Sequence, residues 1–221
     1  MFRLATALLC ILSFAAKPLL GQLHAPWVSC WSQSDQWEGP KTVRTPLVTS
    51  PDGKLKAYAQ IEASVPFPHG CENTVRLFVS TQKSAGFHQV FLQRPSDLDG
   101  NANSLGPIIW SPNKRWLLVE FEQGCYGCDG GGIGVLLYDR TTGKVVIPNL
   151  PHLAETTLNQ KSCWMDLRKI DGFDASSRVH LHLADAFEEG EDQTETYCFK
   201  GTEEWTFDPA DGTLRSVTAH P

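Results

Sequence analysis

One phrase occurs twice in this chain, and it limits the possible folds more than any other feature. The first copy reads Ser50-Pro-Asp-Gly-Lys-Leu-Lys-Ala-Tyr and the second reads Trp110-Ser-Pro-Asn-Lys-Arg-Trp-Leu-Leu-Val. In each copy a small polar residue precedes Pro, whose ring pre-sets the first turn angle, and Asp-Gly or Asn-Lys supplies the tolerant second position. Apolar, β-rich sequence then follows. We therefore expect an internal repeat of a tight turn and a strand.

The same order of strands is expected around both copies, because apolar and polar residues alternate there as in half-buried strands. In the strand at 55–63, for example, every second residue from Leu55 to Ala63 is apolar. The expected strands lie at 46–49, 55–63, 74–80 and 86–93 around the first copy, and at 115–122, 135–139 and 144–148 around the second. These patterns predict blade-like units near residues 45–94 and 106–150.

The rest of the chain is more diverged. A short helix is expected at 153–159, and the last hairpin, Asp208-Pro-Ala-Asp-Gly, echoes the turn after Tyr138. Strands are expected at 164–170, 177–184, 194–199 and 203–208. These features predict a third blade-like unit near residues 162–218. An irregular, Trp-rich segment at 23–45, with Trp27, Trp31 and Trp37, is expected to form a hydrophobic lid over one end of the domain.

Two motifs carry a resemblance to a known family. Ser-Pro-Asp-Gly-Lys before an apolar strand, followed by a hairpin such as Leu137-Tyr-Asp-x-x-x-Gly-Lys, resembles the blade signature of TolB-type and related WD-like β-propellers. The resemblance covers roughly residues 45–150 and implies a blade more than a function. Closed propellers use about four to eight blades, whereas this chain offers three units.

The fold class that follows is all-β, with blade-like antiparallel sheets in an incomplete or small β-propeller-like arrangement, or alternatively a β-sandwich. Three outcomes stay open. The N-terminal segment completes a fourth sheet, the chain forms a small open sandwich of blade-like sheets, or copies associate and hide the open sheet edges.

The N-terminus has the pattern of a cleaved signal peptide. An apolar run from Leu4 to Ala16 follows Arg3, and small residues end it. The run is shorter than the roughly 20 residues of a membrane span. We therefore expect a signal peptide at 1–21 and a single all-β domain at 22–221, secreted or periplasmic, without a transmembrane segment.

The charge of the chain disfavours nucleic acid as a partner. Loss of the leader removes two basic residues, Arg3 and Lys17, and takes the formal net charge from −6 to −8. An acidic surface repels phosphate backbones, and no cluster of Lys and Arg with interleaved aromatic residues occurs in the sequence.

Six cysteines remain after removal of the leader, and an even number in an exported chain indicates disulfides. They are Cys30, Cys71, Cys125, Cys128, Cys163 and Cys198. Six cysteines allow 15 pairings, and the sequence does not choose among them. Cys71, Cys125 and Cys128 fall in equivalent loops of neighbouring units, so a bridge between those loops is reasonable. The spacing Cys125-Tyr-Gly-Cys128 also occurs in redox and zinc sites, but the glycines that follow do not sustain a helix.

Two segments are candidate metal sites. The loop Asp97-Leu-Asp99-Gly-Asn101-Ala-Asn103 places oxygen-bearing side chains at alternate positions, as a calcium site requires, although exposed turns use the same residues. His180 and His182 project from one face of an expected strand, and Asp185 follows close by. Such a set can begin a zinc site. The simpler interpretation is that both histidines lie on the solvent side of a half-buried strand.

Motifs of common enzymes are absent from the sequence, including Gly-x-Ser-x-Gly, a phosphate loop, a dinucleotide fingerprint and His-Glu-x-x-His. The favoured hypothesis is a non-catalytic binding module that contacts a protein or a cell-envelope component and needs no cofactor. The alternative is an exported calcium- or zinc-dependent protein or hydrolase-type enzyme. It would use the Asp97 loop, the histidine pair or a reactive Cys125–Cys128 pair.

Overall fold

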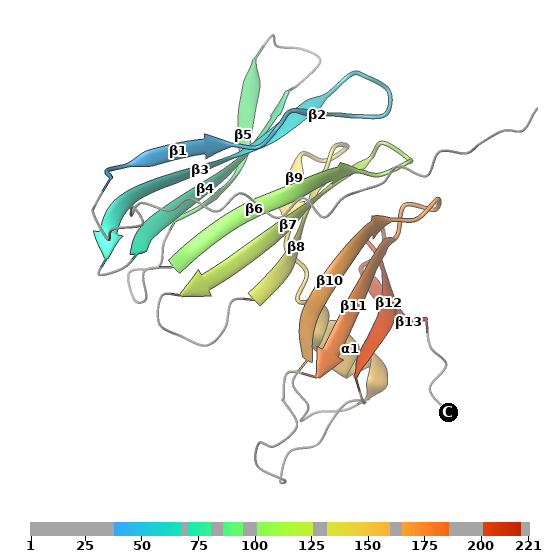
Figure 1. Ribbon diagram of the computed structural model, residues 1–221. Helices are drawn as coiled ribbons and strands as arrows, with labels where there is room; N and C mark the ends of the chain where they lie inside the picture. Colours follow the sequence, from blue (N-terminus) through green and yellow to red (C-terminus); the bar gives the residue numbers. More distant parts are fainter. Residues whose placement is uncertain are drawn as a thin grey trace, which may run out of the picture.

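The computed structural model describes residues 38–67, 70–80, 86–94, 101–125, 132–159, 165–185 and 201–217. Within them, only the backbone is described at 64–67, 70–71, 101–103 and 123–125. These residues form three antiparallel sheets and one short helix, α1 (Leu150–Leu158) (Figure 1). No helix among them is long and apolar enough to span a membrane.

Each sheet is built from strands that follow one another in the chain. Sheet 1 contains β1 (Lys41–Arg44), β2 (Val48–Thr49), β3 (Lys56–Phe67), β4 (Gly70–Ser80) and β5 (Phe87–Gln93). Sheet 2 contains β6 (Asn101–Trp110), β7 (Trp116–Cys125), β8 (Gly132–Asp139) and β9 (Lys144–Val146). Sheet 3 contains β10 (Met165–Phe173), β11 (Val179–Asp185), β12 (Thr202–Asp208) and β13 (Thr213–Ser216).

The strand order confirms the predicted fold class. Sheets 2 and 3 are meanders with the orders β6-β7-β8-β9 and β10-β11-β12-β13. Sheet 1 has the order β1-β3-β4-β5, and β2 adds a second, short partner for β3. In the part of the chain that the structure describes, none of the three sheets closes on itself. The protein is therefore all-β and built from blade-like antiparallel sheets.

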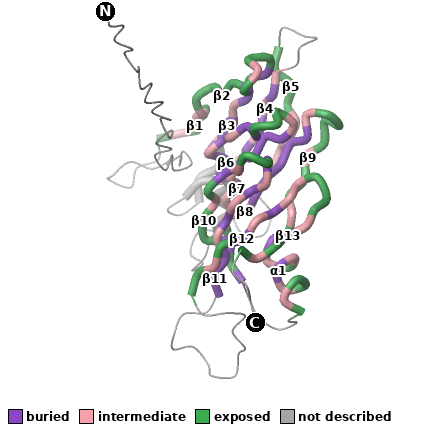
Figure 2. The backbone as a smooth tube through the Cα atoms, turned by 90° about the vertical axis from the view of Figure 1, so that its right-hand side faces the viewer, coloured by how far each residue is buried: buried purple, intermediate pink, exposed green. Residues whose placement is uncertain are grey.

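The three sheets are stacked in chain order with sheet 2 in the middle (Figure 1). One hydrophobic core lies between sheets 1 and 2, and a second lies between sheets 2 and 3, where α1 also packs. Because β7 has a core on each side, Leu117 and Val119 enter the first core and Trp116 and Leu118 enter the second. The buried residues accordingly run through the centre of the stack, and the exposed ones lie at its rims (Figure 2).

Sheet 1 contributes small side chains to the first core. Alternate residues of the predicted strand at 55–63 are all buried, and three of them are alanines: Leu55, Ala57, Ala59, Ile61 and Ala63. Alanine has little bulk above the sheet, so sheet 2 can approach closely. The predicted alternation along this strand is confirmed.

The turns of the two Ser-Pro motifs have the same hydrogen bonds. Ser50 Oγ donates to Asp52 Oδ1 (2.7 Å) and accepts from the N–H of Leu55 (2.9 Å). Ser111 Oγ donates to Asn113 Oδ1 (2.7 Å) and accepts from the N–H of Trp116 (2.9 Å). The serine in each motif therefore closes the turn and holds the start of the long strand, at Leu55 directly before β3 and at Trp116 in β7.

The turn between β10 and β11 lacks this serine and uses a carboxylate instead. Asp174 Oδ1 accepts from the N–H of Arg178 at 2.8 Å. The turn is one residue shorter, but its fourth residue keeps a left-handed backbone, as in the two Ser-Pro turns. The φ angle is 69° at Gly53, 65° at Lys114 and 66° at Ser177.

Polar contacts between the turns tie the sheets together. Arg140, in the turn after β8, donates to Asp52 Oδ2 of the sheet 1 turn at 3.0 Å. The N–H of Asn113, in the sheet 2 turn, donates to Ser177 Oγ of the sheet 3 turn at 3.0 Å. The motif that the sequence repeats therefore lies where neighbouring sheets meet.

The structure extends or shifts several expected elements. β1 lies inside the segment expected to be irregular, and the hairpin of β3 and β4 continues into the loop expected near residue 70. β6 begins at Asn101, where a loop was expected. The helix starts earlier than expected because Asn149 caps it by accepting from the N–H of His152. The strand expected at 194–199 and the Trp-rich residues up to Trp37 lie outside the described residues.

Candidate binding surface

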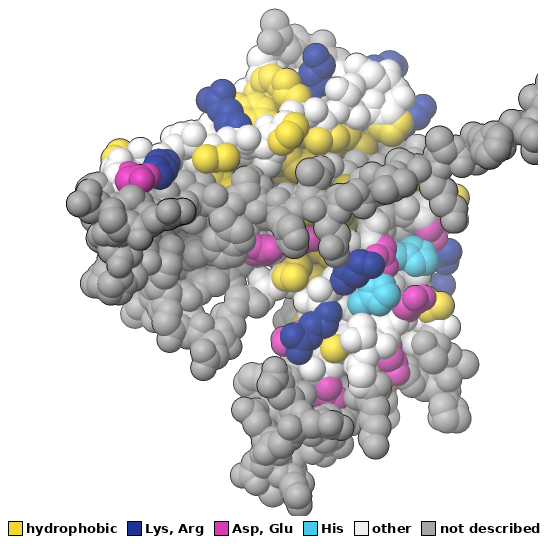
Figure 3. Space-filling view, in the orientation of Figure 1, with side chains coloured by type: hydrophobic (Ala, Val, Ile, Leu, Met, Phe, Trp, Pro, Cys, Tyr) yellow, Lys and Arg dark blue, Asp and Glu magenta, His cyan; other side chains and the backbone are white. Residues whose placement is uncertain are grey.

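Stacking leaves one face of sheet 1 and one face of sheet 3 outside the two cores. In Figure 3, hydrophobic side chains flanked by Lys and Arg gather over sheet 1, whereas His, acidic and basic side chains mix over sheet 3. The face of sheet 3 holds the histidine pair that the sequence singled out. We treat this face as the candidate binding surface.

Strand β11 directs both histidines outward. Val179, Leu181 and Leu183 are almost completely buried in the second core, so the residues between them face the other way. His180 and His182 are accordingly half-buried on the outer face. The alternation along β11 therefore places both histidines on its outer face.

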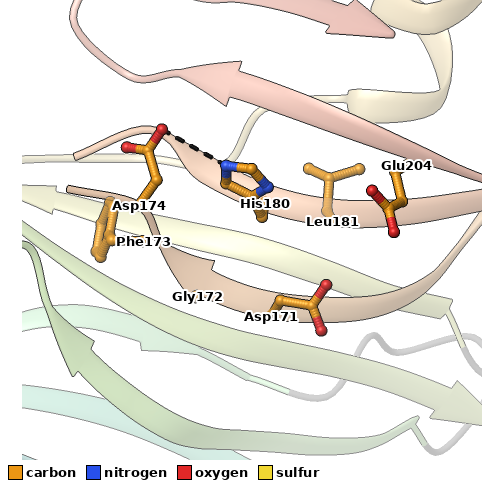
Figure 4. A pocket seen from close by; sticks show the side chains of 7 residues that line it. All are labelled: Asp171, Gly172, Phe173, Asp174, His180, Leu181 and Glu204. Carbon is orange, nitrogen blue, oxygen red and sulfur yellow. Dashed lines mark ion pairs between the residues drawn. The ribbon is translucent and has the colours of Figure 1, made fainter. Parts of the chain in front are cut away.

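A hollow forms beside His180 because β10 is irregular there. The β10–β11 ladder shifts register twice, and Gly172, opposite His180, has a φ of 107°. A pocket of about 330 Å³ opens at this point. It is lined by Asp171, Gly172, Phe173, Asp174, His180, Leu181 and Glu204 (Figure 4).

Each histidine of the surface faces its own carboxylate. His182 Nε2 lies 2.6 Å from Asp171 Oδ2, and His180 Nε2 lies 3.5 Å from Asp174 Oδ2. Figure 4 shows the side chains of Asp174 and His180 pointing toward each other. The two imidazoles are thus held by two separate partners and do not share one centre.

Basic side chains complete both clusters. Lys169 Nζ lies 2.6 Å from Asp171 Oδ1, and a nitrogen of the Arg178 guanidinium lies 2.8 Å from Asp174 Oδ2. Burial raises the pKa of Asp171, but hydrogen bonds from Lys169 and His182 outweigh it and leave the pKa below its usual value. Burial likewise raises the pKa of Asp174, and the hydrogen bonds from Arg178 again bring it below its usual value. Both carboxylates are therefore ionised at neutral pH.

The structure does not bring Asp185 to the histidines. Asp185 follows Leu181 and Leu183 on the other face of β11, and its side chain is buried. Among the described residues, no group of three or more His, Cys, Asp or Glu side chains is arranged to hold a metal ion. His180 and His182 lie on one face of β11 and Asp185 on the other, so the three side chains do not converge on one centre.

The other predicted sites fall outside the described side chains. Asp97 and Asp99 lie outside the described residues, and of Asn101 and Asn103 only the backbone, in β6, is described. Four cysteines also lie outside, namely Cys30, Cys128, Cys163 and Cys198, and Cys71 and Cys125 are described by their backbone alone. The calcium loop and the disulfides stay predictions.

Sequence reasoning missed the carboxylates that line the pocket. Asp171 and Asp174 belong to the strand and turn before β11, and Glu204 lies opposite His182 on β12. Gly172, within Asp171-Gly-Phe-Asp174, is a usable signal, because a glycine inside a strand often marks a bulge. The register that brings these acids to the histidines depends on contacts between strands.

Comparison with family models, curated proteins and solved structures yields no match for this chain. The resemblance to TolB-type and WD-like blades therefore rests on the motifs quoted above.

Proposed function

We propose that this protein is an exported, non-catalytic binding module that contacts a protein or cell-envelope component through the outer face of sheet 3. Its sheets are proposed to be propeller-type blades in an incomplete arrangement. The observation that carries the function is the pocket beside His180. Its ionisable side chains sit on a rigid sheet face, and both histidines are paired there with carboxylates.

The ion pairs of Asp171 and Asp174 favour a role in binding a partner over a role in catalysis. A general base or nucleophile needs a group poised to accept a proton or attack. Here burial raises the pKa of Asp171 and Asp174, but their pairing with Lys169 and Arg178 leaves each pKa below its usual value, so both carboxylates are weak proton acceptors. Fixed and oppositely charged groups side by side on a surface give a partner a pattern to match, and such complementarity supplies specificity.

A capture experiment with matched variants tests this function. The wild-type protein, without its leader, is immobilised and exposed to the envelope fraction and the medium of the producing cells. The test variant combines Asp171→Asn with Glu204→Gln, which remove two exposed charges from the pocket and keep side-chain size. The control is Glu155→Gln, on the surface of α1. We expect one component retained by wild type and control and lost by the pocket variant.

Two results would contradict the proposal. One is a set of captured components that the pocket variant retains unchanged. The other is a rise in melting temperature with calcium or zinc that the pocket variant abolishes, because a ligand that binds only the folded state stabilises it by mass action. That result would favour the metal-dependent alternative.

A further inference from the structure

The outer face of sheet 1 is ordered along its strands by chemical character. Residues paired across β3 and β4 form successive rows: Glu62 beside Thr74, Gln60 beside Arg76, and Tyr58 beside Phe78, and Lys56 donates its N–H to Ser80. These side chains alternate with the buried residues of the first core, so they point away from it. Along β3 the rows are therefore acidic, basic, aromatic and basic.

The aromatic row is a cluster at the surface. Tyr58 stacks on Phe78 with ring centroids 4.9 Å apart, and it meets Phe87 of β5 edge to face at 5.0 Å. The Arg44 guanidinium lies over the Tyr58 ring at 5.4 Å. Phe87 is still 38% exposed. This cluster therefore leaves apolar surface in contact with water.

The basic row is held rigidly beside the aromatic one. Arg44 Nε donates to Gln60 Oε1 at 2.8 Å, and Gln60 Nε2 donates to Glu62 Oε1 at 2.6 Å. Arg76 pairs with the same Glu62. Because these contacts fix the side chains, binding to this face orders few of them and costs little conformational entropy.

We infer that the outer face of sheet 1 binds the same face of a second copy of this chain. The two copies are related by a two-fold axis that lies between the faces, parallel to the sheet and perpendicular to the strands. Such an axis reverses the order of the rows. Lys56 of one copy then lies opposite Glu62 of the other, and the row of Arg44 and Arg76 lies opposite the row of Tyr58 and Phe78. Unlike charges meet, and guanidinium groups meet aromatic rings, which attract cations.

The alternative axis, parallel to the strands, is disfavoured by charge. It would place each row opposite the same row of the other copy, so Lys56 and Glu62 would not meet and the two basic rows with Arg44 and Arg76 would face each other, which is destabilising. The size of the face also sets the strength of the contact. Four strands about 4.8 Å apart, over about seven residues of about 3.4 Å, give roughly 450 Å² per copy, which is typical of a weak and reversible dimer.

A charge-swap series measured by sedimentation velocity tests this dimer. Leaderless wild type is expected to pass from monomer to dimer as its concentration rises into the upper micromolar range. Lys56→Glu and Glu62→Lys each place like charges opposite each other, and each is expected to weaken the dimer by about tenfold or more. The double variant restores the opposite pairing and is expected to return to within about threefold of wild type.

Two further variants keep the test independent of folding. Arg215→Glu changes a charge on β13 of sheet 3 and is expected to leave dimerisation unchanged. Phe87→Ser removes exposed apolar surface and is expected to weaken it, with an unchanged far-UV circular dichroism spectrum. The inference is overturned if wild type stays monomeric at every concentration, if the double variant is no stronger than the single ones, or if Arg215→Glu weakens the dimer as much as Lys56→Glu does.

Discussion

Sheet 2 and the two sheets beside it differ in how many of their faces are buried. In β7, the consecutive residues Trp116, Leu117, Leu118 and Val119 are all buried, because a core lies on each side. In β11, buried Leu181 and Leu183 flank a half-buried histidine. A strand of the middle sheet thus has a continuous run of apolar residues, whereas a strand of an end sheet alternates apolar and polar residues. We therefore expect stability to be concentrated in the middle sheet, and we propose that the outer faces of the end sheets serve in recognition.

The largest expected effect comes from removing a side chain of the middle sheet. Leu118 is fully buried in the second core, and truncation to Ala leaves a cavity in a close-packed interior. Leu118→Ala is expected to lower the free energy of unfolding by about 2–5 kcal/mol, as measured by urea denaturation. The matched change on an end sheet, His180→Ala, is expected to cost about 0.5 kcal/mol or less. Similar losses for the two variants would contradict a greater contribution of the middle sheet to stability.

A charged residue of the middle sheet gives the second largest effect. Glu120 lies on the face of β7 that points toward sheet 3, and burial, together with the nearby Glu122, raises its pKa to about 7. The folded state therefore favours the protonated carboxyl, and its contribution to stability is lost as the pH rises from about 4.5 through 7.

Glu120→Gln removes this loss. At pH 8 the variant is expected to be more stable than wild type by about 2 kcal/mol, and at pH 4 the two are expected to be equal. Urea denaturation at several pH values measures the difference. A gap between the two proteins that is constant with pH would contradict the assignment.

The two Ser-Pro turns, one before β3 of an end sheet and one before β7 of the middle sheet, are expected to contribute equally to stability. Ser111→Ala removes the acceptor for the N–H of Trp116, which leads into the buried β7. The expected loss of unfolding free energy is about 1–2 kcal/mol. Ser50→Ala removes the corresponding acceptor for Leu55 in sheet 1 and is expected to cost about the same, because the hydrogen bonds are equal in length. Losses that differ by more than about 1 kcal/mol would show that the turns are not equivalent.

The smallest effect on stability is expected on the outer face of sheet 3. Asp171→Asn removes an exposed carboxylate that pairs with Lys169 and His182, and exposed ion pairs contribute about 0–1 kcal/mol. Because the pKa of Asp171 is lowered, any contribution is present above its usual pKa and is lost on acidification. Circular dichroism melts from pH 3 to 7 measure it. A loss as large as that of Leu118→Ala would give this face a structural role.

Local patterns predicted most of the strands, and for β3 and β11 they also predicted which face is buried. Alternation identified the buried side of β3 and placed His180 and His182 on the outside of β11, since both follow from the period of a strand. The Ser-Pro motifs located two of the turns between strands. β1 was missed because Lys41-Thr-Val-Arg44 is short and mixed in polarity, and its partner β3 is distant in the chain.

The candidate surface was harder to predict than the strands. Its histidines were found, but Asp185 was assigned to them because it is near in sequence. Asp171 and Asp174 reach them instead, through the register shifts at Gly172. A bulge changes which residues face outward. This one packs against the neighbouring sheet, because a Cβ at Gly172 would lie 3.4 Å from Cδ1 of Ile109 in β6. This contact is between residues of two different sheets, so no pattern of neighbouring residues in the sequence predicts it.

Native-state hydrogen exchange followed by mass spectrometry tests most directly whether the stack is organised around a doubly buried middle sheet. Peptides from β7 and β8 are expected to exchange last, near the rate set by global unfolding. Peptides from β5 and β13, at the edges of the end sheets, are expected to exchange first. The account is contradicted if β7 exchanges no more slowly than β3 or β11, or if the three sheets exchange as independent units.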